Sequence, residues 1–135
     1  MKEFNQNQSK KHDEIQIWCY ENIKEIITSV STENYSYDDI KILELDIEKP
    51  IIKSAYNGIN IVGYLDLYCR FSLKNSNPSI LIEVKPEIFS LGDLIRQVKT
   101  YRIHMGNIIP VVVSKTDKYK DILINQGIRF FKYEY

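Results

Sequence analysis

The stretch ILIEVK, residues Ile80 to Lys85, decides how the centre of the chain folds. Its even-numbered residues are apolar, which is the period of two expected of a strand that buries one face. Leu81, Glu83 and Lys85 share the other face of that strand. Side chains two positions apart on a strand start about 7 Å from each other, so a carboxylate and an ammonium there can converge on one ion and its water. The pattern therefore predicts a half-buried strand that carries an acid and a base side by side.

A hairpin is expected before this strand. In the run Lys41–Glu48, alternate residues are apolar (Leu43, Leu45 and Ile47), and this pattern predicts a half-buried strand. The pair Asn57-Gly58 that follows is typical of a type I′ turn, in which both central residues take positive φ. The sequence therefore predicts that the chain turns back on itself at Asn57-Gly58.

The returning strand, Ile59–Phe71, contains a second acid. Its odd-numbered residues from 61 to 71 are apolar or glycine, which predicts that they all point one way. Asp66 then lies mid-strand on the opposite, partly polar face. We expect its carboxylate to share one side of the sheet with Glu83 and Lys85.

The rest of the chain alternates between helical and extended patterns. Apolar residues recur at helical spacing from Asp13 to Val30, and Ser90 and Asp93 resemble a capping box that opens a helix ending near His104. Further elements are predicted as a buried strand at 108–113, a helix at 118–125 and a strand at 128–132. The order α-β-β-β-α-β, followed by α-β, predicts an α/β fold with a central mixed sheet flanked by helices.

Composition agrees with one small domain spanning residues 1–135. The chain of 15.9 kDa is 44% hydrophobic and 27% charged, and its longest apolar run, Ile108–Val113, is far too short to cross a membrane. Cys19 and Cys69 lie far apart without a metal-binding spacing, as expected of reduced thiols in a cytoplasmic protein. The net charge is zero, yet residues 85–120 hold 7 Lys/Arg against 3 Asp/Glu. This basic segment predicts a local phosphate-facing patch.

The paired acids and the lysine have a chemical rationale. Mg²⁺ prefers oxygen ligands and keeps several waters, so Asp66 and Glu83, with the backbone carbonyl of Val84, would suffice to hold it against a phosphate. The ion would polarise the phosphate, and Lys85 would orient or deprotonate the attacking water. The alternative is that Glu83 and Lys85 form a solvated pair on an exposed face.

The helix at 90–104 adds a second set of candidates. Gln97 and Tyr101 are four residues apart and share one helix face, and three basic residues surround them. We expect the basic residues to bind nucleic-acid phosphates: Arg96, Lys99 and Arg102.

Together, Asp66, the Glu83-Val84-Lys85 stretch and the Gln97-x-x-x-Tyr101 element resemble the PD-(D/E)XK nuclease superfamily. The last element is most similar to the branch of RecB-type nuclease domains and lambda exonuclease. The resemblance implies a restriction-endonuclease-like fold and Mg²⁺- or Mn²⁺-dependent hydrolysis of DNA. The residue before Asp66 is Leu65, where the superfamily often has proline.

Each site residue has a role that the resemblance implies. Asp66 and Glu83 would be metal ligands, Lys85 the catalytic lysine and Gln97 an orienting group, while Tyr101 would pack or contact the nucleic-acid backbone. The RecB-type branch carries a histidine in an early helix, for which His12 is the candidate. Other branches use a first-helix glutamate, and the candidates are Glu14, Glu21 and Glu25, of which Glu21 is favoured.

Two further interpretations stay open from the sequence. The chain could be a catalytically silent nuclease-fold module that binds nucleic acid or a protein partner, or a small α/β interaction protein in which the acid–base pair is accidental. The sequence also does not decide whether the substrate is DNA or RNA, or whether the protein would act as an endonuclease or an exonuclease. Because the chain has no added recognition module, a homodimer is compatible with it.

Overall fold

The computed structural model describes residues 2–32 and 36–135, with the side chains of all of these except residues 2–8 and 55. Its helices are α1 (Lys2–Glu21), α2 (Ile23–Val30), the 3₁₀ turn η1 (Tyr37–Asp39), α3 (Leu91–Met105) and α4 (Lys120–Asn125). Its strands are β1 (Lys41–Ala55), β2 (Gly58–Ser72), β3 (Ser79–Lys85), β4 (Ile109–Ser114) and β5 (Arg129–Lys132).

The strands form one five-stranded mixed sheet in the order β1-β2-β3-β4-β5. β1 pairs with β2 and β2 pairs with β3 in antiparallel orientation, whereas β3, β4 and β5 are parallel to one another and are connected through α3 and α4. The prediction of an α/β fold with a mixed sheet and flanking helices is confirmed.

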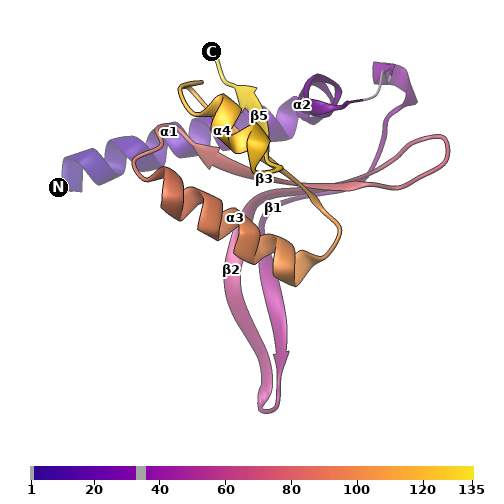
Figure 1. The fold of residues 1–135 in the computed structure, drawn as a ribbon, viewed down its shortest axis with the longest axis horizontal. Coiled ribbons are helices and arrows are strands. Elements are labelled where there is room, and N and C mark those ends of the chain that lie inside the picture. The colour runs from indigo at the N-terminus through magenta and orange to yellow at the C-terminus, as the bar shows by residue number, and fades with distance from the viewer. Residues whose placement is uncertain (1, 33–35) are drawn as a thin grey trace.

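Helices cover both faces of this sheet. In Figure 1, α1 and α2 lie behind the sheet and α3 and α4 lie in front of it. The α1 side buries the even-numbered apolar residues of β3, as the alternation in ILIEVK predicts. The α3 side buries Leu81 and Val112 beneath Tyr101 and Val98. The face of β3 that carries Glu83 is therefore a second core layer and not a solvated surface.

The first helix differs from the prediction because the chain interrupts it at Asn22. Residues 13–30 are divided between α1, which begins much earlier, and α2. The side-chain amide of Asn22 donates to the carbonyl oxygen of Trp18 at 2.9 Å, and Asn22 itself has φ −123° and ψ 33°. Asparagine competes in this way for helical backbone groups, so it favours a break. Ile15 and Ile26 nevertheless both enter the same core.

The first strand is also more irregular than predicted. A register shift between Ile42 and Glu44 lets Ile42 and Leu45 pack against the core, whereas Leu43 and Ile47 are 40% and 41% exposed. The prediction that Leu43 shares the buried face with Leu45 is wrong, because the bulge at Leu43 changes the alternation there. Ile47 follows Leu45 without a shift, opposite Leu67, and is nevertheless partly exposed.

The β1–β2 hairpin projects from the body of the protein (Figure 1). Strand β2 pairs with β3 only from Leu67 onward, so residues 58–66 are paired with β1 alone. The turn lies one residue earlier than predicted, with Tyr56 and Asn57 at its centre, and neither has the positive φ that a type I′ turn requires. Gly58, at the start of β2, has a positive φ of +125°. Among the described residues, Glu48 in β1 is the non-glycine residue that has a positive φ.

Candidate active site

The candidate site forms where β2 changes faces and separates from β3. Leu67 packs in the core on the α1 side, whereas Leu65 packs with Tyr101 on the α3 side. Two residues of equal parity therefore lie in different layers, and the prediction that all the odd-numbered residues from 61 to 71 point one way is wrong. In β1, Glu48 lies across from Asp66, between the pairs Ile47–Leu67 and Lys49–Leu65, and has φ +56°. This left-handed residue marks a local irregularity in the hairpin at the level of Asp66.

Asp66 points from this irregularity toward β3. Its Oδ2 accepts a hydrogen bond from the backbone N–H of Val84 at 2.7 Å. The ladder between β2 and β3 ends at Leu67–Ile82, so the Asp66 carboxylate accepts the N–H that a continuing strand would have paired. Asp66 is thereby held between the two layers, within reach of groups from both faces of the sheet.

Helix α1 holds Asp66 from one of these faces. His12 Nε2 lies 3.0 Å from Asp66 Oδ1, and Gln16 Nε2 donates to the Asp66 carbonyl oxygen at 2.9 Å. Gln16 also donates to Glu48 Oε1 at 3.0 Å and is only 5% exposed. Because His12 and Gln16 are four residues apart, they occupy one face of the helix. Sequence reasoning missed Gln16 and Glu48. The one signal that could have found Gln16 is its spacing of four residues from His12.

The ion pair with Asp66 sets the charge of His12. The hydrogen bond with Asp66 is the largest of several effects that raise the pKa of His12 to about 9, against a smaller opposing effect of burial. His12 is therefore a cation at neutral pH, and its positive charge compensates the Asp66 carboxylate in the absence of a metal.

The first-helix acids that sequence reasoning proposed lie elsewhere. Glu14, Glu21 and Glu25 are exposed, and Glu21 ends α1 nine residues beyond His12, about 13.5 Å along the helix axis. The structure places Glu21, the favoured acid, at the exposed end of α1 and away from Asp66. The α1 side chain that contacts the Asp66 carboxylate is that of His12.

Glu83 lies on β3 with its carboxyl group buried at 2% exposure. Its Oε2 is 3.9 Å from Lys85 Nζ, and its Oε1 has no hydrogen-bond partner among the residues that the structure describes. Burial, and after it the negative charge of Asp66, raises the pKa of Glu83 to about 8, although Lys85, the Asp66 backbone and His12 act in the opposite direction. The alternative of a solvated surface pair is therefore wrong for Glu83.

Gln97 and Tyr101 approach the acids from α3. Gln97 Nε2 donates to the Tyr101 hydroxyl at 2.8 Å, and Tyr101 is 9% exposed. Burial is the largest cause of a raised pKa for Tyr101, the hydrogen bond from Gln97 opposes it, and the charges of Glu83 and Asp66 add to it. The ring packs over β2 at Gly63, where a Cβ would lie 3.2 Å from Tyr101 Cε1. Of the two roles expected for Tyr101, this geometry favours packing over contact with nucleic acid.

A small depression opens beside these residues. It has a volume of about 180 Å³ and is bordered by Lys85 on one side and by Gln97 and Asp93 of α3 on the other. Lys85 is 34% exposed, so its ammonium is accessible to a molecule in the depression, whereas the neighbouring Glu83 is buried. The depression therefore brings Lys85 and Gln97 together with the carboxylates of Glu87 and Asp93, and Lys85 connects it to the buried Glu83.

The basic residues of α3 do not all face this depression. Arg96 forms an ion pair with Asp93 near the start of the helix. Lys99 is about 200° around the helix from Gln97 and donates to Gln126 Oε1 at 2.9 Å. Arg102 lies beside Gly127. Lys99 and Arg102 are therefore on the side of α3 toward the connection between α4 and β5, and not on the side of Gln97 as predicted.

The donor set suits a hard divalent cation held by few protein groups. In the part of the chain that the structure describes, no group of three or more His, Cys, Asp and Glu side chains is arranged as a metal cluster. Mg²⁺ needs only one or two carboxylates and otherwise keeps its waters. The unpartnered Oε1 of Glu83, beside a second carboxylate, is a buried acceptor that such a cation would satisfy. The residues present therefore fit Mg²⁺ or Mn²⁺.

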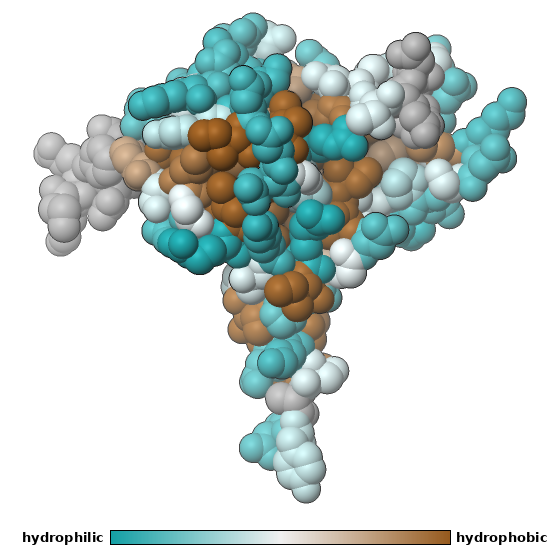
Figure 2. All heavy atoms as spheres, viewed as in Figure 1, coloured by the Kyte–Doolittle hydropathy of each residue, from teal (hydrophilic) through white to brown (hydrophobic). Residues whose placement is uncertain are grey.

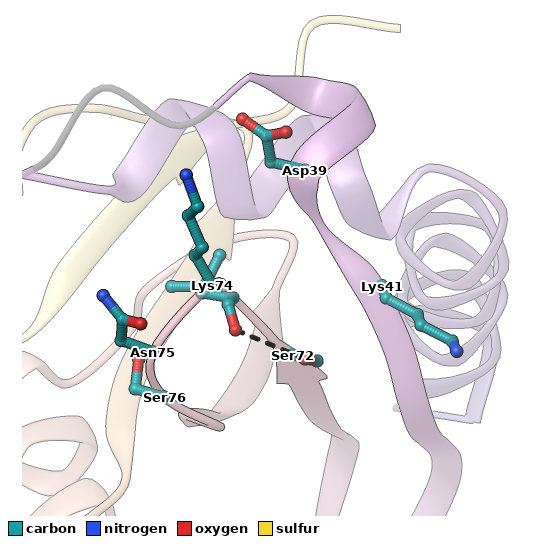
Figure 3. A pocket seen from close by; sticks show the side chains of 7 residues that line it. Asp39, Lys41, Ser72, Lys74, Asn75 and Ser76 are labelled. Atoms are coloured by element: carbon teal, nitrogen blue, oxygen red, sulfur yellow. Dashed lines mark hydrogen bonds between the residues drawn. The ribbon is translucent and has the colours of Figure 1, made fainter.

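A surface pocket of about 720 Å³ lies far from this site, at the other end of β2 (Figure 3). It is bordered by Ser72, six residues and about 20 Å of strand from Asp66. Lys74 extends toward Asp39 in this view, whereas Lys41 points away from Lys74. All the side chains that border it are exposed or half-buried, so the pocket does not provide the dry environment found at Glu83.

Comparisons with known proteins found no match: no family model, curated protein or solved structure matches this chain. Across the described residues, the helices are all too short or too polar to span a bilayer.

Proposed function

We propose that this protein is a divalent-metal-dependent nuclease that hydrolyses DNA phosphodiester bonds. The observation that carries the proposal is the buried Glu83 carboxyl, which has an unpartnered oxygen and lies in the electrostatic field of Asp66. A protein that used this region only for packing would gain stability from an apolar residue there, because a buried acid is costly without partners. Strongly perturbed acids in a recess are typical of functional sites.

The metal would be held by Asp66 and Glu83, with the backbone carbonyl of Val84 as a third donor. Bound there, such an ion supplies Lewis acidity toward a phosphoryl oxygen and a water of lowered pKa. Asp66 is prepared for this role because three of its contacts fix it: those with His12, Gln16 and the Val84 amide. His12 is also at the early-helix position where the resemblance to RecB-type domains leads one to expect a histidine, and it would have to lose its proton to act as a nitrogen donor.

Lys85 and Gln97 act on the substrate side of the acids in this proposal. The Lys85 ammonium is accessible at the depression and would orient the attacking water and offset the charge that develops on the phosphate. Gln97, fixed by its bond to Tyr101, would position the water or the scissile phosphate. Arg96, Lys99 and Arg102 remain predicted phosphate contacts, for DNA that extends over the exposed side of α3.

We place the enzyme in the cytoplasm. Cys19 and Cys69 are free and buried, and free thiols are typical of a reducing compartment.

The experiment is a cleavage assay with the full chain on single-stranded, duplex and branched DNA and on RNA, with Mg²⁺, with Mn²⁺ or with EDTA. We expect cleavage of at least one DNA substrate that requires the metal and is lost in Glu83→Gln. Glu21→Gln is the matched control, since it removes an exposed acid of the same chemistry far from Asp66. Undiminished cleavage in EDTA would reject the mechanism. DNA binding without cleavage under every condition would support the silent-module alternative.

A further inference from the structure

Among the residues that the structure describes, none forms a partner strand for one long edge of the β1–β2 hairpin. Residues 58–66 of β2 pair with β1 on one side, and the pairing with β3 on the other side starts only at Leu67. The backbone groups along this open edge are available to another strand. We define the open edge as residues 58–64, with the sequence GINIVGY.

The open edge also carries exposed apolar side chains. Ile59, Ile61 and Val62 are 71%, 54% and 42% exposed, and Tyr64 is 50% exposed. Figure 2 shows hydrophobic surface on the part of the hairpin nearest the body and a more hydrophilic tip. Contiguous exposed apolar surface of this kind marks an interaction site more often than a free surface.

The two edges of the hairpin differ in how they are protected. Strand β1, the outer strand of the sheet, has Lys49, Pro50 and Lys53. The register shift opposite Ile51 and Ile52 leaves the extra residue, Val62, on β2. Charges and proline are among the features by which edge strands avoid pairing with other chains. The open edge of β2 has no Lys, Arg, Asp, Glu or Pro in residues 58–64. The charges and the proline of the hairpin are thus on the β1 edge, and the β2 edge has neither.

We propose that the open edge of β2 pairs antiparallel with the same edge of a second copy of this chain, which gives a twofold-symmetric dimer with a continuous sheet through both hairpins. An antiparallel strand can pair with its own copy about a twofold axis, and one such contact covers both open edges at once. Like charges that meet across such an axis destabilise the pair. The charge-free GINIVGY sequence avoids that repulsion, in a chain whose residues are otherwise 27% charged.

The proposal is independent of the proposed function, since it uses none of the acids or cations of the active site. The interface would be at the small end of the range for stable dimers, which bury about 800 Å² per partner. We therefore expect dissociation on the order of micromolar, with the monomer dominant in dilute solution.

The first test is sedimentation equilibrium of the full chain over a wide range of concentration. We expect a monomer–dimer equilibrium for the wild type and a monomer for Ile61→Lys, which places like charges near the axis. Ile122→Lys is the matched control, because Ile122 is a similarly exposed isoleucine, at 46%, on α4. A monomer at every concentration, or a dimer that Ile61→Lys leaves unchanged, overturns the proposal.

The second test locates the axis by oxidative cross-linking of single-cysteine variants at residues 59 to 62. Both native cysteines are 0% exposed and do not compete. We expect rapid disulfide formation at one position and a decline on either side of it, with none for Ile52→Cys on the protected strand. Cross-linking of Ile52→Cys in preference to the β2 variants would overturn the proposal. So would a monomeric wild type in which Ile61→Lys changes the affinity for DNA and Ile122→Lys does not, since the hairpin would then contact nucleic acid instead.

Discussion

His12 Nε2 on α1 lies 3.0 Å from Asp66 Oδ1 on β2, and this ion pair connects the first helix of the chain to the centre of the sheet. One helical turn later, Gln16 binds the backbone carbonyl of the same aspartate. A single face of α1 therefore fixes both the side chain and the main chain of Asp66. The position of the candidate metal ligand depends on the docking of α1 as much as on β2 itself.

Gln16→Ala should destabilise the protein and misplace Asp66. Gln16 is buried and donates to both Asp66 and Glu48, so its removal leaves two acceptors without this donor. The loss in unfolding free energy should be about 1–3 kcal/mol in urea denaturation. Gln126→Ala, which removes an exposed glutamine that binds Lys99, should change stability by less than about 0.5 kcal/mol. Equal effects of the two substitutions would contradict a structural role for Gln16.

Glu83→Gln should stabilise the metal-free protein while removing its response to metal. Folding at neutral pH either buries the Glu83 charge or requires uptake of a proton, and both cost free energy; glutamine avoids both. A gain of about 0.5–2 kcal/mol in unfolding free energy is expected without metal. The check is thermal denaturation with and without Mg²⁺ or Mn²⁺. The melting temperature of the wild type should rise when metal is added. The melting temperature of the variant should be higher than that of the wild type without metal and should not change when metal is added. A variant that still rises as the wild type does would place the ion elsewhere.

Lys85→Ala should reduce the cleavage rate far more than the affinity for DNA. The ammonium is accessible beside Glu83, and its proposed partners are the attacking water and the developing charge, which exist only during reaction. A loss of about 10²–10³-fold in kcat at saturating DNA is expected. Lys85→Arg should not restore the rate, since the guanidinium is always protonated and has a different shape. Weaker binding with a normal rate at saturation would make Lys85 a phosphate contact only.

Gly63→Ala should disturb Tyr101 and, through it, Gln97. A Cβ at Gly63 would lie 3.2 Å from Tyr101 Cε1 and 3.5 Å from its hydroxyl oxygen, and the ring is buried. Accommodating the methyl should cost about 1–3 kcal/mol of stability. Gly92→Ala is the control, because its Cβ would meet only the flexible Arg96 side chain and alanine suits a helix, so we expect unchanged or slightly higher stability. A Gly63→Ala protein as stable as Gly92→Ala would show that the Tyr101 ring moves without cost.

Where the signal is local, the sequence was sufficient. The alternation in ILIEVK placed Glu83 and Lys85 on one face of β3, and the Ser90 hydroxyl accepts the Asp93 N–H as the capping pattern predicts. Both features depend on residues within one strand or one helical turn. The spacing of Gln97 and Tyr101 likewise predicted their shared helix face, and they are hydrogen-bonded.

Only the tertiary structure determined where the Asp66 carboxylate lies and which groups it contacts. Parity along β2 assumes an even strand, but Leu65 and Leu67 enter different cores, and Glu48 in the neighbouring strand takes a left-handed conformation at that level. The contacts of His12 and Gln16 with Asp66 also join segments about fifty residues apart, which no local pattern encodes. The burial of Glu83 depends on α3 covering a face that the alternation alone describes only as polar. Local sequence fixes which side chains share a face, whereas packing between distant elements fixes which of those faces are dry and which groups meet there.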